Sequence, residues 1–138
     1  MHDLGLWREV QLLGFVTGAL KLSLCQGAQV FALPTHHENF GLALIEALGC
    51  GTPLVTTRGV DIASELQQSG AVSLVERHPV AFADALEKSI SHAEQRESAG
   101  QSARAWLFRQ FDEAPVMQQM LALYLPHFIA SEQLSTKS

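Results

Sequence analysis

The chain has 138 residues, of which 47% are hydrophobic and 17% are charged, as expected for one folded domain with a buried core. The formal net charge of −5 argues against a general nucleic-acid-binding protein, which would carry a basic face. No apolar run approaches the ~18 residues of a membrane-spanning helix, and Met1-His2-Asp3 does not begin a signal peptide. Cys25 and Cys50 stand among apolar residues and are expected to be reduced, which favours a cytoplasmic protein. Peripheral membrane contact stays open.

In chain order, short apolar runs alternate with stretches of helical periodicity. The predicted strands are 9–16, 30–33, 54–57 and 71–75. The predicted helices are 18–27, 40–48, 61–68, 79–93, 98–111 and 114–129. Strands without polar alternation, separated by helices, indicate a doubly wound parallel α/β sheet followed by C-terminal helices. The domain is expected to cover 1–130, with a polar tail over 131–138.

The stretch after the second predicted strand has the pattern of a strand-to-helix turn with two carboxylates. Pro34 cannot continue the strand ladder, and Asn39 is the predicted N-cap of the next helix. Glu38 then lies in the loop and Glu46 about two turns along the helix, so both can face one crevice. The unpaired N–H groups at the helix start favour an anion such as phosphate, and carboxylates accept hydrogen bonds from sugar hydroxyls.

Residues 34–55, with Glu38 and Glu46 eight positions apart, resemble the donor-site signature of the group 1 glycosyltransferases, which are retaining enzymes of the GT-B fold. The similarity extends from Val10 to the C-terminal helices and so covers most of the chain. It implies a Rossmann-like C-terminal GT-B domain that binds a nucleotide-diphosphate sugar. The sugar would be transferred to an acceptor with retention of the anomeric configuration.

The resemblance also implies roles for individual residues. Glu38 would be the catalytic carboxylate beside the transferred sugar, and Glu46 would orient the nucleotide through its ribose. The remaining expected donor-binding residues are His37, Asn39, Phe40, Gly41, Leu42, Phe15 and Val16. The backbone N–H groups of 39–42 would contact the diphosphate or the sugar, whereas the Phe40 side chain is expected in the core. For Phe15, expected at the rim where the base binds, core packing is an equal alternative.

Simpler interpretations stay open for both glutamates. Glu46 could be an ordinary surface residue of a helix, and Glu38 a solvated loop residue that favours the helix start. The adjacent His36 and His37 point in different directions and have no third ligand at a metal-site spacing, so no metal and no cofactor is expected.

The resemblance covers only part of a transferase. In the family, basic side chains that hold the diphosphate follow the first strand of this domain, and nothing in 1–8 matches them. The chain is therefore expected to be the later part of a donor-binding domain, separated from an N-terminal acceptor-binding domain and inactive alone. The alternatives are a non-catalytic nucleotide-sugar-binding or interaction module, and an epimerase or phosphorylase of the same fold.

Strand order gives a further expectation. Doubly wound domains commonly run 3-2-1-4-5-6, and the strand at Val10 would be the third while those at Val30, Leu54 and Val72 would be the fourth to sixth. The strand at Val10 would then not neighbour the strand at Val30. An open sheet edge predicts a dimer, a non-native pairing of the Val10 strand, or marginal stability.

Overall fold

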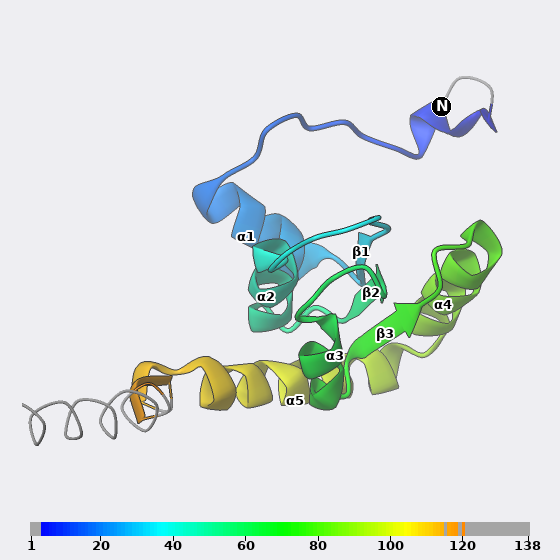
Figure 1. Cartoon of the computed structure of the whole chain (residues 1–138). Helices are drawn as coiled ribbons and strands as arrows, with labels where there is room; N and C mark the ends of the chain where they lie inside the picture. The colour runs from blue at the N-terminus through cyan, green and yellow to red at the C-terminus, as the bar shows by residue number, and fades with distance from the viewer. Residues whose placement is uncertain (1–3, 115, 119, 121–138) are drawn as a thin grey trace, which may run out of the picture.

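A three-stranded parallel sheet forms the centre of the computed structural model, which describes residues 4–114, 116–118 and 120 (Figure 1). The strands are β1 (Phe31–Leu33), β2 (Leu54–Thr57) and β3 (Val72–Val75), in the order β1-β2-β3. All four residues of β2 are buried, as expected for a central strand with helices on both faces. The predicted α/β class and the adjacency of these three strands are confirmed.

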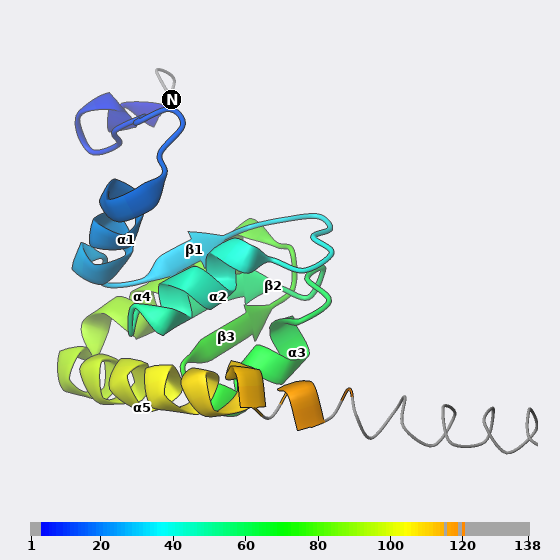
Figure 2. The same cartoon turned by 90° about the vertical axis from the view of Figure 1, so that its left-hand side faces the viewer.

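Helices cover both faces of this sheet (Figures 1 and 2). On one face α2 (Leu42–Gly49) packs against β1 and β2, and on the other α4 (Pro79–Ser91) packs against β2 and β3. The short helix α3 (Ala63–Leu66) and the 3-10 turn η3 (Gln67–Ser69) connect β2 to β3. The long helix α5 (Ala93–Phe111) lies against α2 and η3, while α1 (Gly18–Gly27) lies against α2.

The core lies between the sheet, α2, α3 and α5. Its largest fully buried side chains are Leu44, Leu48, Leu54 and Leu66. At Gly100 of α5 a side chain would collide with the carbonyl oxygen of Gly51, which directly follows α2. Helix α5 therefore approaches the end of α2 at backbone distance, which only glycine at position 100 permits.

Three buried threonines fix the position of β1 and its flanks. The hydroxyl of Thr52 donates to the carbonyl of Cys25 at 2.5 Å, and that of Thr56 to the carbonyl of Leu33 at 3.0 Å. Thr57, the last residue of β2, donates to the carbonyl of Thr35 at 2.5 Å. The loop that leaves β1 is thus tied to the end of β2 by a hydrogen bond additional to the ladder.

The predicted strand over 9–16 is wrong. This segment runs without a ladder partner between the 3-10 turn η2 (Leu6–Arg8) and α1, and it lies apart from the sheet in both views (Figures 1 and 2). Leu12 and Phe15 are 81% and 96% exposed. An apolar run forms a strand only beside a partner, and in the part of the chain that the structure describes β1 pairs with β2 alone.

The other predicted elements fall close to their observed positions. The chain around Thr17 and Gly27 bounds α1 as expected, and the predicted helix over 98–111 is the later part of α5. Most of the predicted helix over 114–129 and the tail over 131–138 lie outside the described residues. Among the helices that the structure describes, none has the length and apolar character needed to cross a membrane.

Candidate functional site

The candidate site lies at the carboxyl edge of the sheet, where the loop from β1 to α2 meets the loop from β2 to α3. Glu38 and Val60 form a parallel bridge between the two loops. The Glu38 N–H donates to the Gly59 carbonyl at 2.9 Å, and the Asp61 N–H donates to the Glu38 carbonyl at 3.2 Å. A side chain at Gly59 would collide with the backbone carbonyl of His36. Backbone contacts therefore fix where the Glu38 loop stands.

Gly41 directs the chain into α2. It is the N-cap, with φ 66° and ψ 47°, and its carbonyl accepts from the Leu44 N–H at 2.8 Å. A left-handed residue is required here, and an added Cβ would also stand 3.1 Å from Val60 Cγ1. The prediction of Asn39 as N-cap is wrong by two residues, because the turn needs the backbone freedom of glycine more than a side-chain cap.

Backbone donors gather at this turn. Among the described residues, the N–H groups of Asn39, Phe40, Gly41 and Leu42 have no backbone acceptor. They stand at the positive end of α2, a helix of eight residues. Such a cluster of unpaired amides can bind the oxygens of a phosphate or another anion.

The side chains around these amides face solvent. Glu38 and His37 are exposed, as are Phe40 and Leu42, at 51% and 64%. The expectation that Phe40 packs in the core is wrong. Because α2 begins at Leu42, Phe40 belongs to the loop and not to the buried face of the helix.

Glu46 has a different environment in the middle of α2. Its Oε1 lies 2.6 Å from Nζ of Lys21 on α1, and the two side chains are 37% and 38% exposed. The sequence alone does not reveal this contact between Lys21 and Glu46. The two positions lie 25 residues apart on different helices, so no periodicity or motif spacing could have paired them.

The structure does not bring Phe15 and Val16 to this site. Both belong to the segment that lies apart from the sheet, with Phe15 fully in solvent and Val16 half-buried (Figure 2). The expectation that they end a strand at the rim depended on the strand that is absent. The carboxyl edge of the candidate site is therefore formed by two loops, those after β1 and β2.

The two cysteines lie where α1 and α2 meet, with Cys25 in α1 and Cys50 directly after the last residue of α2. Cys25 is buried, Cys50 is half-buried, and both are free. Burial raises the pKa of the Cys25 thiol, and Cys50 and Glu46 act in the same direction. Cys50 Sγ also lies 3.8 Å from the carbonyl oxygen of Leu22.

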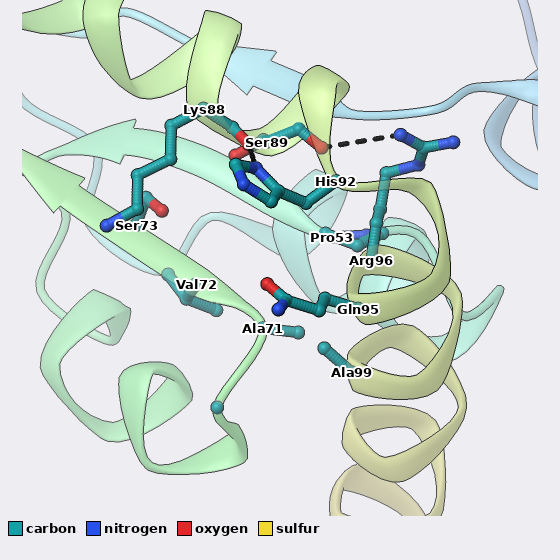
Figure 3. A pocket seen from close by; sticks show the side chains of 11 residues that line it. Pro53, Ala71, Val72, Ser73, Lys88, Ser89, His92, Gln95, Arg96 and Ala99 are labelled. Carbon is teal, nitrogen blue, oxygen red and sulfur yellow. Dashed lines mark hydrogen bonds between the residues drawn. The ribbon is translucent and has the colours of Figure 1, made fainter.

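Two hollows border α4 near the edges of the sheet, apart from a third of about 310 Å³ between Gln29, Thr52 and Arg96. One, of about 400 Å³, is at the carboxyl edge beside α4, between Pro34, Thr57 and Phe82. The other, of about 250 Å³, is at the opposite edge, at the junction of α4 and α5 (Figure 3). None of the predicted donor residues lines either hollow.

Basic side chains at the second hollow have a structural explanation. Arg96 donates to the carbonyls of Ile90 and Ser89 at 2.7 and 3.4 Å, and His92 Nδ1 lies 3.1 Å from the Lys88 carbonyl (Figure 3). These contacts satisfy the last carbonyl groups of α4, which otherwise lack partners. The hollow is therefore the junction between two helices, and the loops after β1 and β2 remain the candidate site.

Comparison with known proteins gives a consistent result. Residues 1–106 match the family described as glycosyl transferases group 1. The chain is 32% identical over 126 residues to a D-inositol 3-phosphate glycosyltransferase of Gordonia bronchialis, covering 89% of this chain and 27% of that protein. It is 36% identical over 105 residues to the protein of the same name from Corynebacterium jeikeium, covering 74% of this chain and 25% of that one.

A solved structure shows the same fold. Sucrose-phosphate synthase from Thermosynechococcus elongatus superposes with a TM-score of 0.79 over 94% of this chain and 33% of that one, at 24% sequence identity. The chain thus spans about a quarter of the length of the curated relatives that it matches. The parallel sheet, the superposition and the family match over more than half of the chain agree. The chain has the fold of a GT-B glycosyltransferase domain and belongs to the group 1 glycosyltransferase family.

Proposed function

We propose that this chain is the donor-binding part of a retaining glycosyltransferase that uses a nucleotide-diphosphate sugar. The observation that carries the proposal is the turn into α2. There, unpaired backbone N–H groups over 39–42 stand between Glu38, just before the turn, and Glu46, one helix turn further along. One ligand with a diphosphate between a ribose and a sugar contains groups that suit all three features.

Each feature has a chemical task in such a transfer. The N–H groups and the positive end of α2 stabilise the charge that develops on the leaving diphosphate. Glu38 flanks the oxocarbenium-like centre of the transferred sugar. Glu46 accepts hydrogen bonds from ribose hydroxyls. The helix end and the amides supply the positive potential, so the proposal involves no metal and no cofactor.

The acceptor is proposed by analogy with the relatives. Their name, D-inositol 3-phosphate glycosyltransferase, makes a phosphorylated cyclitol the first acceptor to test. The chain spans about a quarter of the length of these relatives. We therefore expect the chain alone to bind donor without transferring the sugar, with a second, acceptor-binding domain required for turnover. The alternative of a non-catalytic nucleotide-sugar-binding module predicts the same donor binding and no transfer in any context.

The test is a titration of the isotopically labelled chain with a panel of nucleoside-diphosphate sugars, followed through the backbone amide signals. The proposal predicts that at least one donor shifts the signals of 38–42 and Glu46. Shifts confined to the α4–α5 junction, or none with any donor, would contradict it. A pairwise comparison of bases and sugars within the panel would also identify the donor class.

A further inference from the structure

Lys21 makes a short ionic contact with Glu46 of the candidate site. Its ammonium lies 2.6 Å from Oε1 of Glu46, a distance typical of a charge-assisted hydrogen bond. Both side chains are little more than one-third exposed, whereas those of a second ion pair, between Arg58 and Glu76, are 62% and 75% exposed. An ion pair of the second kind contributes little, but the first is shielded enough to hold the carboxylate in place.

The contact changes what Glu46 offers to a ligand. With Oε1 bound to Lys21, the carboxylate presents Oε2, which can only accept hydrogen bonds. Lys21 has three N–H donors and uses one of them on Glu46, so two remain. The pair therefore presents an acceptor and a donor together, which suits vicinal hydroxyls because each hydroxyl both donates and accepts.

We propose that Lys21 positions Glu46 and selects ribonucleotide over deoxyribonucleotide donors. This inference rests on the proposed function. The ribose 2′- and 3′-hydroxyls bind to the Lys21–Glu46 pair as a unit, and loss of either the ammonium or one hydroxyl leaves a half-buried polar group without its partner. A purely structural role, in which the ion pair only fastens α1 to α2, predicts no such selectivity.

The test measures binding of ribonucleoside diphosphates and their 2′-deoxy counterparts to the full chain and to Lys21→Met and Lys21→Arg variants. The parent is expected to prefer the ribonucleotide by about tenfold, the effect of one hydrogen bond to a charged group. Lys21→Met is expected to reduce the preference to about twofold or less, and Lys21→Arg to retain most of it. The matched control is Lys88→Met, because Lys88 is an exposed lysine of α4 on the other face of the sheet.

Several outcomes separate this inference from the proposed function. If the parent shows the ribose preference and Lys21→Met keeps it, Lys21 has only a structural role and the inference fails alone. If the parent binds no nucleoside diphosphate, the proposed function and the inference fail together. Should Lys21→Met not fold, the ratio of ribonucleotide to deoxyribonucleotide affinity is measured for Lys21→Gln instead, which retains an N–H donor without the charge. A double-mutant cycle with Glu46→Gln should be non-additive, and additive losses would contradict a shared unit.

Discussion

The two glutamates of the candidate site differ in the atoms around them. Glu46 is half-buried and bound to Lys21, whereas the Glu38 side chain is exposed and only its backbone is fixed, by the bridge to Val60. A paired carboxylate suits recognition of the ground state. An exposed carboxylate on a rigid backbone suits the stabilisation of charge that develops in the transition state.

Substitutions of Glu38 and of Glu46 should therefore have different effects on turnover and on donor affinity. In a transferase that carries this chain together with its acceptor-binding part, Glu38→Ala should lower kcat by about 10²–10³ and change donor affinity much less. Glu38→Gln, which keeps the size of the side chain, is the matched variant and should lose nearly as much. Unchanged turnover with weakened donor binding would instead make Glu38 a simple donor contact.

Cys25 provides a second test at this scale. Burial raises the pKa of its thiol above that of the unfolded chain, so the unfolded state releases its proton first as the pH rises. The contribution of the protonated Cys25 thiol to the free energy of unfolding is fully present below about pH 8 and is lost as the pH rises through the folded pKa.

The burial of Cys25 also predicts its reactivity. In the folded chain at neutral pH, an alkylating reagent should modify Cys25 more slowly than the less buried Cys50. Equal alkylation rates of Cys25 and Cys50, measured by mass spectrometry, would contradict the greater burial of Cys25.

Among the helices and strands, the sequence predicts the ends of an element correctly wherever a single residue sets that end. Pro34 ends β1, Gly49 ends α2, and Pro79 begins α4, and each signal acts on its own neighbours. The failures concern contacts that local patterns do not contain. The run over 9–16 has the composition of a strand but no partner, and Asn39 has the side chain of an N-cap where the turn needed Gly41.

The contact between the two site loops yields a prediction about Gly59. Replacing Gly59 with Ala should push the Glu38 loop away, because an added methyl group would collide with the backbone carbonyl of His36. We expect a loss of about 1–3 kcal/mol in the free energy of unfolding, together with weaker donor binding. Gly27→Ala is the matched control, since Gly27 has open space around it and no left-handed backbone. Urea unfolding of both variants measures the difference, and equal stability would show that the loops are not clamped.

The site itself was predictable only in part. The residues of the turn, 37–42, and Glu46 could be named because they follow one another along one strand, one loop and one helix. The contact of Lys21 with Glu46, the close approach of Gly59 to His36 and the threonine hydrogen bonds could not be predicted, because they join segments more than 20 residues apart. Phe15 and Val16 were placed at the site through a strand that the structure does not contain.

Across the whole molecule, the described sheet has two edge strands, β1 and β3, and the chain exposes much apolar surface. Among the described residues, β1 has a ladder partner on one side only. Large apolar side chains are also exposed in the segment before α1 and on α1 itself, namely Leu12, Leu13, Phe15 and Leu20. Unpaired backbone groups beside apolar surface favour association of two copies.

We therefore expect the chain alone to self-associate. Sedimentation velocity over about a hundredfold range of concentration should show a dimer that grows with concentration, and the melting temperature should rise with it. Phe15→Asp should shift the equilibrium toward monomer, because it places a charge on the exposed apolar segment. A monomer at every concentration, with cooperative unfolding that does not depend on concentration, would contradict this expectation.

The proposed binding of a nucleotide-diphosphate sugar at the turn into α2, with Glu46 on its ribose, can be measured by isothermal titration calorimetry of one Glu46 variant. With the donor that the parent binds best, Glu46→Ala should weaken the binding free energy by about 1–3 kcal/mol. Glu87→Ala, which removes an exposed glutamate of α4 on the other face of the sheet, should leave it unchanged. Equal donor affinity in Glu46→Ala and the parent would remove Glu46 from the site and contradict the account.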